Sequence, residues 1–293
     1  MERPATDTTR ATGSGSPVTE LGEFLRSRRD RLTPGDVGVS SYGRRRVPGL
    51  RREELALIAG VSITYLTRLE QGQSQNASAE VIGALARALQ LDADERAHLF
   101  ALAHSAPAKR PYRSESENAK PGAERLLHAM GEVPAVLLGR FNDILAWNRT
   151  GHLLLAGHLD PEDPAHPGRR PNQIRLLFLD ERVRDLYIDW EDEAALAVAS
   201  LRFVAAQFAE DRRVVELVGD LSVNSAEFAR LWAGHDVRLC TSGTKRLHHP
   251  ELGDLTLGYE LLHLPEGNGQ RILTHTAEPG SASSAALRLL TGS

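Results

Sequence analysis

The chain has 293 residues, of which 41% are hydrophobic and 25% are charged, a composition typical of a globular protein with about two domains. Its single cysteine, Cys240, excludes an intramolecular disulfide, and no apolar run reaches the about 18 residues of a membrane span. We therefore expect a cytoplasmic protein with no membrane partner. The net charge of −4 is unevenly placed: residues 21–52 carry nine Arg and three acidic residues, whereas residues 123–293 carry 17 Lys and Arg against 24 Asp and Glu. This asymmetry predicts different partners for the two halves.

The first part of the chain reads as a helical domain behind a polar tail. Residues 1–19 are rich in Ser, Thr and Gly and lack an apolar segment, which predicts a disordered tail and no signal peptide. Apolar residues recur at helical spacing through residues 20–104 and predict five helices, with a Gly- and Pro-rich loop at residues 33–49. Ser62, Ser78 and Asp92 are the predicted N-caps of the last three helices.

Two short helices joined at Gly60 form the most informative motif of the chain. Glycine tolerates the positive backbone dihedral of a tight turn. Ala56, Val61, Leu66 and Leu69 are expected to be buried and to hold the two helices together. This pattern is typical of a helix-turn-helix, in which the second helix enters the major groove of DNA.

The motif resembles the Cro and phage-repressor (XRE) family of helix-turn-helix proteins. The matching residues are Leu55-Ala56, Gly60-Val61-Ser62, Tyr65-Leu66, Leu69-Glu70-Gln71-Gly72 and the helix Leu85–Leu89. The resemblance implies an all-α, five-helix, lambda-repressor-like domain whose partner is double-stranded DNA. It also implies that Arg52 contacts phosphate, that Ile63, Thr64 and Arg68 read bases, and that Glu70 pairs with Arg29 in a structural role.

The predicted DNA-binding residues lie in the loop, at the start of the first motif helix and along the second. They are Arg44, Arg45, Arg46, Arg51, Arg52, Ser62, Ile63, Thr64, Tyr65, Thr67 and Arg68. A basic cluster supplies the phosphate contacts that dominate affinity for DNA. Two alternatives stay open: the loop arginines form a solvated surface, and Tyr65 packs or touches a phosphate instead of reading a base.

Residues 105–122 are polar and contain proline, which predicts an interdomain linker, and residues 123–293 read as an α+β domain. Residues 136–148 predict a β-hairpin with its turn at Asn142–Asp143. Helices are predicted for residues 174–187, 189–209, 211–222 and 225–236. Three strands are predicted for residues 237–249, 252–264 and 270–279, with turn signals at Ser242–Gly243, Gly253–Asp254 and Gly267–Asn268.

This second half is similar to actinobacterial regulators with an MmyB-like C-terminal domain, as is the stretch of residues 42–56. The matching segments are residues 136–140, 142–148, 176–180, 187–191, 228–232, 235–262 and 276–281. The resemblance implies a PAS-like sensor domain and a fatty acid or similar apolar ligand. A homodimer is expected from the helix-turn-helix class, because a single motif covers only a half-site of DNA.

Large side chains and a few polar groups of this domain are the candidate walls of a ligand pocket. The predicted ligand-binding residues are Phe141, Leu145, Trp147, Asn148, Phe178, Trp190, Phe203, Trp232, His235 and Tyr259. Arg140, Arg238 and Lys245 are further candidates for holding a carboxylate. Each of the large apolar side chains is more often part of an ordinary hydrophobic core than of a ligand pocket.

Enzyme chemistry has little support in the sequence. His248-His249 lacks the spacing and the companion ligands of a zinc site, and Cys240 has no identifiable base. Ser242-Gly243-Thr244-Lys245 lacks the preceding glycines of a phosphate-binding loop. We therefore predict no catalytic residue, no metal and no cofactor. Two alternatives remain: an enzyme tethered by the helix-turn-helix, and a second domain that binds a partner protein and no small molecule.

Overall fold

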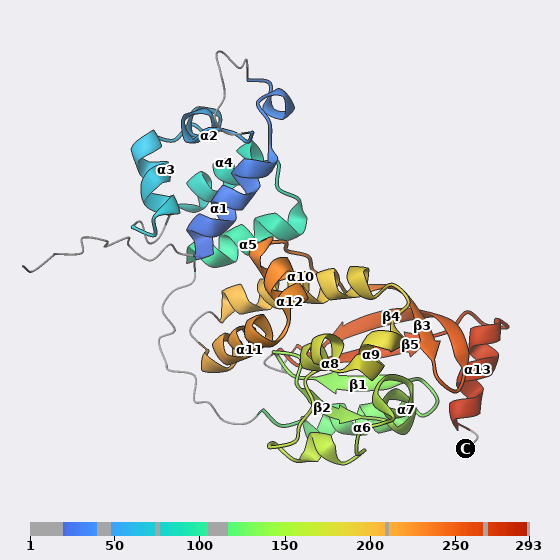
Figure 1. Ribbon diagram of the computed structural model, residues 1–293. Helices are drawn as coiled ribbons and strands as arrows, with labels where there is room; N and C mark the ends of the chain where they lie inside the picture. Colours follow the sequence, from blue (N-terminus) through green and yellow to red (C-terminus); the bar gives the residue numbers. More distant parts are fainter. Residues whose placement is uncertain are drawn as a thin grey trace, which may run out of the picture. The chain divides into compact units, whose positions relative to one another are not determined.

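The computed structural model describes residues 20–39, 48–73, 77–104, 117–208, 211–265 and 269–291 (Figure 1). It divides into two compact units, one formed by residues 1–92 and 102–104, the other by residues 93–101 and 105–293. The predicted tail 1–19, residues 105–116 of the predicted linker, and Arg44, Arg45 and Arg46 lie outside the described residues.

The five helices predicted for residues 20–104 are all present. They are α1 (Glu20–Arg31), α2 (Arg52–Ala59), α3 (Ile63–Glu70), α4 (Ala79–Ala88) and α5 (Ala93–His104), with a short 3₁₀ helix, η1 (Gly35–Val37). The Ser62 hydroxyl accepts a hydrogen bond from the Tyr65 N–H at 3.1 Å, and the Ser78 hydroxyl accepts one from the Val81 N–H at 3.3 Å. Gly60 ends α2 at a φ of 68°. These contacts confirm the predicted N-caps of α3 and α4 and the predicted end of α2.

The second unit is built on one antiparallel sheet of five strands in the order β2-β1-β5-β4-β3. The strands are β1 (Ala135–Leu138), β2 (Ile144–Trp147), β3 (Ser242–His249), β4 (Gly253–His263) and β5 (Arg271–Thr276). The predicted hairpin is confirmed as β1 and β2, and its Asn142 adopts a φ of 67°. Because β1 also pairs with β5, the hairpin and the three later strands form a single sheet.

Helices cover both faces of this sheet (Figure 1). On one face, Leu127 of α6 (Pro121–Ala129) packs with Leu137 and Ile272. On the other face, Val136 and Leu273 pack against residues of the helices that follow β2. Those helices and the remaining elements are α7 (Arg149–Ala156), η2 (Asp163–Ala165), α8 (Gln173–Leu179), α9 (Glu181–Leu186), α10 (Trp190–Gln207), α11 (Arg212–Asn224), α12 (Ala226–Ala233) and α13 (Ala282–Thr291).

The single helix predicted for residues 174–187 is wrong. Asp180 takes an extended conformation, with φ −108° and ψ 115°, and separates α8 from α9. Its carboxylate accepts hydrogen bonds from the N–H groups of Arg182 and Val183, so it caps the second helix. Although Asp180 lies within a continuous apolar pattern, it begins a second helix because its side chain caps that helix. Helices α6, α7 and α13 were not predicted.

The turn predicted at Ser242–Gly243 is also wrong. Both residues lie inside β3 and pair with Glu260 and Tyr259 of β4. A Cβ atom on Gly243 would lie 2.8 Å from a ring carbon of Tyr259, so the glycine makes room for that ring and does not mark a turn. β3 begins at Ser242, and residues 237–241 are not strand. The turn predicted at Gly267–Asn268 lies outside the described residues.

Candidate functional site

Helix α3 divides sharply into an inner and an outer face. Leu66 and Leu69 are completely buried. Ile63, Thr64 and Arg68 are exposed, and the Ile63 side chain keeps 51% of its surface open although it is apolar. Ile63, Thr64 and Arg68 therefore form one exposed surface on the outer face of α3.

Buried Glu70 at the end of α3 fixes the helix against its neighbours. Its side chain has no exposed surface, and it accepts hydrogen bonds from Arg29 of α1 at 3.3 Å and from Arg52 of α2 at 2.7 Å. This confirms the pairing of Glu70 with Arg29. Arg29 also donates to the Leu50 carbonyl oxygen at 2.6 Å. A carboxylate bonded to residues of two neighbouring helices fixes the end of α3 against α1 and α2.

Arg52 has a structural partner that the sequence did not indicate. Its guanidinium pairs with Glu70, while 42% of its side chain remains exposed. The backbone N–H of the half-buried Arg51 donates to the Glu54 carboxylate at 2.7 Å. On α3, the Thr67 hydroxyl donates to the Ile63 carbonyl oxygen at 2.8 Å, and Tyr65 is half-buried. DNA contacts by these residues remain predictions.

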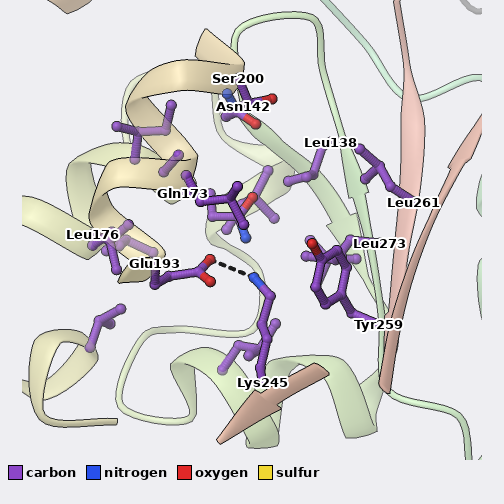
Figure 2. Close-up of a pocket in the computed structure, with 18 of the residues that line it drawn as sticks. Leu138, Asn142, Gln173, Leu176, Glu193, Ser200, Lys245, Tyr259, Leu261 and Leu273 are labelled. Atoms are coloured by element: carbon purple, nitrogen blue, oxygen red, sulfur yellow. Dashed lines mark hydrogen bonds and ion pairs between the residues drawn. The ribbon is translucent and has the colours of Figure 1, made fainter. Parts of the chain in front are cut away.

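A cavity lies in the second unit between the sheet and helices α7 to α10 (Figure 2). It measures about 100 Å³. Its walls are mostly apolar side chains of the sheet and of α8 and α10, interrupted by a few polar groups. The lining residues are Val136, Leu138, Asn142, Ile144, Trp147, Leu155, Ala156, Gln173, Ile174, Leu176, Leu177, Val183, Tyr187, Glu193, Leu196, Ala197, Ser200, Cys240, Lys245, Tyr259, Leu261, Arg271 and Leu273.

An ion pair between Lys245 of β3 and Glu193 of α10 lines the cavity (Figure 2). The Lys245 ammonium also lies 4.6 Å from the centre of the Tyr259 ring and 5.6 Å from that of Tyr187. Burial raises the pKa of Tyr259 to about 12, and burial followed by the charge of Glu193 raises the pKa of Tyr187. Burial likewise raises the pKa of the Cys240 thiol. Both phenols and the thiol therefore stay protonated near neutral pH.

A second polar group of the lining is formed by Arg271 and Asn142. The Arg271 guanidinium donates to the Asn142 side-chain oxygen at 2.5 Å and to the carbonyl oxygens of Arg140 at 3.2 Å and Gly269 at 3.3 Å. Burial lowers the pKa of Arg271 to about 10, against an opposing effect of Glu117. The cavity is thus apolar with polar groups of two kinds, the composition of a small-molecule site.

Two of the ten predicted ligand-binding residues, Trp147 and Tyr259, line this cavity. The other eight have different positions. Phe141 and Phe178 are buried in the main core, and Trp190 and Trp232 pack against that core. Leu145 packs with residues of α6 on the other face of the sheet, and Asn148 caps α7. Phe203 is half-buried on α10, and His235 contacts Arg202. Ligand contact by any of the ten remains a prediction.

Sequence reasoning missed most of the cavity because the lining is made of medium-sized aliphatic residues. A usable signal was present in the strands, where Leu261 and Tyr259 of β4 alternate with outward residues. Another was present in α10, where Glu193, Ala197 and Ser200 recur at spacings of four and three. Without the pairing of β1 with β5, neither signal could be assigned to a common site.

Two further observations concern the described part of the chain. No group of three or more His, Cys, Asp or Glu side chains in these segments is placed to hold a metal ion. No helix among them has the length and apolar character needed to cross a bilayer.

A helix with an exposed outer face seated on a buried ion-pair cluster, together with a separate unit enclosing an apolar cavity, defines a two-domain DNA-binding regulator with a ligand-binding domain. Comparison with known families agrees. Residues 20–99 match the helix-turn-helix domain family, and residues 119–290 match the MmyB-like transcription regulator ligand binding domain. The chain belongs to the family of helix-turn-helix transcription regulators with an MmyB-like ligand-binding domain. No curated protein matches it.

Proposed function

We propose that this regulator is a sequence-specific DNA-binding dimer of the XRE class whose second unit binds a small apolar ligand such as a fatty acid. The observation that carries the DNA-binding half is the two-faced helix α3, fixed by Glu70 on its inner side and presenting Ile63, Thr64 and Arg68 on its outer side. Such a regulator works in the cytoplasm, where bacterial DNA lies.

Base reading by Arg68 gives the sharpest test of sequence specificity. A bidentate arginine–guanine contact contributes about 1–3 kcal/mol of discrimination. Arg68→Ala should therefore relax the preference at one base pair of a selected operator and leave the other positions unchanged, as measured by selection from a randomised DNA pool. Arg87→Ala, which removes an exposed arginine from α4 in the same unit, is the matched control. Equal weakening on every sequence would show that Arg68 contacts only phosphate.

The apolar lining supports a ligand with a hydrocarbon body. Pockets that bury drug-sized ligands usually enclose about 300–1,000 Å³, whereas this cavity measures about 100 Å³. A fatty acid would therefore have to push the lining outward. Residues of α8 and α10 form much of that lining, so we expect ligand entry to move these helices away from the sheet. A ligand can shift the regulator between two states only by binding one of them more tightly.

Native mass spectrometry of the purified full-length protein tests the ligand. A small apolar molecule that copurifies, and that denaturation releases, would support the sensor function. The alternative from another class is that the second unit pairs with a partner protein and holds no small molecule. A spectrum of the bare chain, unchanged after incubation with a panel of fatty acids, would favour that alternative.

A further inference from the structure

We propose that the second unit captures an aliphatic aldehyde as a reversible covalent adduct, an imine, on the amino group of Lys245. The inference rests on the proposed ligand-binding function and assigns a bond-forming residue to the same cavity. Lys245 lies on β3 and lines the cavity, and Figure 2 shows its amino group facing the carboxylate of Glu193 on α10. The ligand class follows from the chemistry of a buried primary amine.

Lysine is so rare in this chain that its place in the cavity calls for an explanation. Of the 35 basic residues, 32 are arginine and only three are lysine, namely Lys109, Lys120 and Lys245. An ion pair with a buried carboxylate is better served by arginine, whose planar guanidinium is more weakly hydrated and donates two parallel hydrogen bonds. A lysine amine can do what arginine cannot: it forms an imine with a carbonyl compound. Reactivity therefore accounts for a lysine at this position better than charge does.

The surroundings of Lys245 suit such a reaction. The side chains of Lys245 and Glu193 are only 8% and 14% exposed, and a buried ion pair is by itself weak evidence for a role in stability. The Glu193 carboxylate lies within hydrogen-bonding reach of the ammonium, so it can accept a proton from it. The ring of Tyr259 lies 4.6 Å from the ammonium, in space that Gly243 leaves open because it has no Cβ. Mostly apolar walls limit the access of the water that would hydrolyse an imine.

The reaction needs no reagent beyond the aldehyde and the two side chains. Glu193 takes one proton from the Lys245 ammonium, the amine adds to the aldehyde carbon, and a second proton moves from nitrogen to the carbonyl oxygen. Glu193 then returns its proton to the new hydroxyl group, which leaves as water while the nitrogen electron pair forms the C=N bond. The product is a protonated imine paired with the Glu193 carboxylate. The buried charges are therefore the same before and after, and water reverses the sequence.

The cavity volume sets the size of the aldehyde. It measures about 100 Å³, and at about 10–15 Å³ for each water-sized group this corresponds to roughly seven to ten non-hydrogen atoms. Octanal falls within this range, so it needs little outward movement of the lining. Its hydrocarbon chain would lie against apolar wall residues such as Leu261 and Leu273.

Reductive trapping of octanal on the full-length protein tests the bond directly. Sodium cyanoborohydride converts an imine into a stable secondary amine, which intact-mass measurement detects and peptide mapping locates. We expect Lys245 to be labelled at least about tenfold faster than Lys120, because the cavity holds the aldehyde against it. Lys120 caps α6 and does not belong to the cavity lining, so it is the internal reference. Equal labelling of the two lysines would overturn the inference, and this result does not depend on the folding of any variant.

Two lysine-to-arginine variants separate the bond from the charge. Octanal is compared with octanol, which cannot form an imine, and binding is followed by intrinsic fluorescence because Trp147 lines the cavity. We expect the wild-type protein to bind octanal at least about tenfold more tightly than octanol, since only octanal adds a covalent bond to the shared apolar contacts. Lys245→Arg keeps a cation beside Glu193 and should lose both the labelling and the preference for octanal. Lys120→Arg should retain both.

The outcomes distinguish this inference from the function on which it rests. A Lys245→Arg protein that keeps the wild-type preference for octanal would overturn the inference, and its binding of octanol would leave the apolar ligand site standing. A wild-type protein that binds neither octanal nor octanol would overturn the inference together with the proposed apolar ligand.

Discussion

His275 on β5 is a buried imidazole that lies opposite Tyr259 of β4. Neither of its ring nitrogens has a hydrogen-bond partner among the residues that the structure describes. Burial, followed by the positive charge of Lys245, lowers its pKa from 6.5 to about 3. The folded protein therefore holds this ring neutral, whereas the unfolded chain protonates it below about pH 6.5.

This difference predicts how stability changes with pH. Because the unfolded state binds the additional proton, the contribution of His275 is fully present above pH 6.5 and is lost as the pH falls toward 3. Between pH 6 and pH 4 the loss approaches about 1.4 kcal/mol per pH unit. His275→Leu should flatten the pH dependence of the unfolding free energy by about that amount. Urea unfolding followed by tryptophan fluorescence measures it, since all three tryptophans lie in the second unit.

His166→Gln provides the control for this experiment, because His166 is exposed on a loop. It should leave the slope as it is in the wild-type protein. If His275→Leu retained the wild-type slope as well, the acid sensitivity would belong to other groups. Asp180 and Asp211, whose pKa values are lowered by hydrogen bonds that oppose their burial, would then be the first to consider.

At the scale of the elements, the contact between α1 and α3 depends on one missing side chain. A Cβ atom on Gly22 of α1 would lie 2.2 Å from the carbonyl oxygen of Glu70, at the end of α3. That atom belongs to the backbone and cannot turn aside. Gly83, inside α4, is the opposite case, because a Cβ there would meet only the flexible end of Arg87 at 3.6 Å.

The two glycines therefore respond oppositely to the same substitution. Gly22→Ala should destabilise the first unit by about 1–3 kcal/mol, because the helices must move apart. Gly83→Ala should stabilise it by about 0.5–1 kcal/mol, because alanine has the higher helix propensity. Far-ultraviolet circular dichroism during urea unfolding reports both, and the tryptophan transition of the second unit serves as the internal reference. If Gly22→Ala left the free energy of unfolding of the first unit unchanged, this result would contradict the close packing of α1 on α3.

At the scale of the whole molecule, the proposed dimer follows from how much DNA one chain covers. A single helix-turn-helix contacts a half-site, and two-fold symmetric proteins read palindromic operators. We expect light scattering of the full-length protein to give twice the mass of one chain, and DNA selection to return an inverted repeat. A monomeric mass both with and without operator DNA would remove the dimer from the proposal.

The local features of the first unit were predictable because each depends on neighbours in the sequence. Ser62 and Ser78 cap helices a few residues away, and Gly60 lies at the turn between α2 and α3. For the second unit, the sequence predicted an α+β domain but not the order of its strands or the positions of all its helices. Asp180 and Gly243 were misassigned because an acidic residue and a glycine each suit several local structures. Asp180 caps a new helix, and Gly243 makes room for the Tyr259 ring of the neighbouring strand, which no local pattern records.

The sequence by itself determined the helix-turn-helix, its caps, the first hairpin and the division of charge between the halves, since short-range spacing encodes all of these. The tertiary structure alone decided that Arg52 pairs with Glu70 and that β1 lies beside β5. It alone placed Lys245 against Glu193, and Arg271 beside Asn142, in one cavity. The physical reason is that burial and charge pairing depend on distances between residues separated by tens of positions in the chain, which no local pattern records.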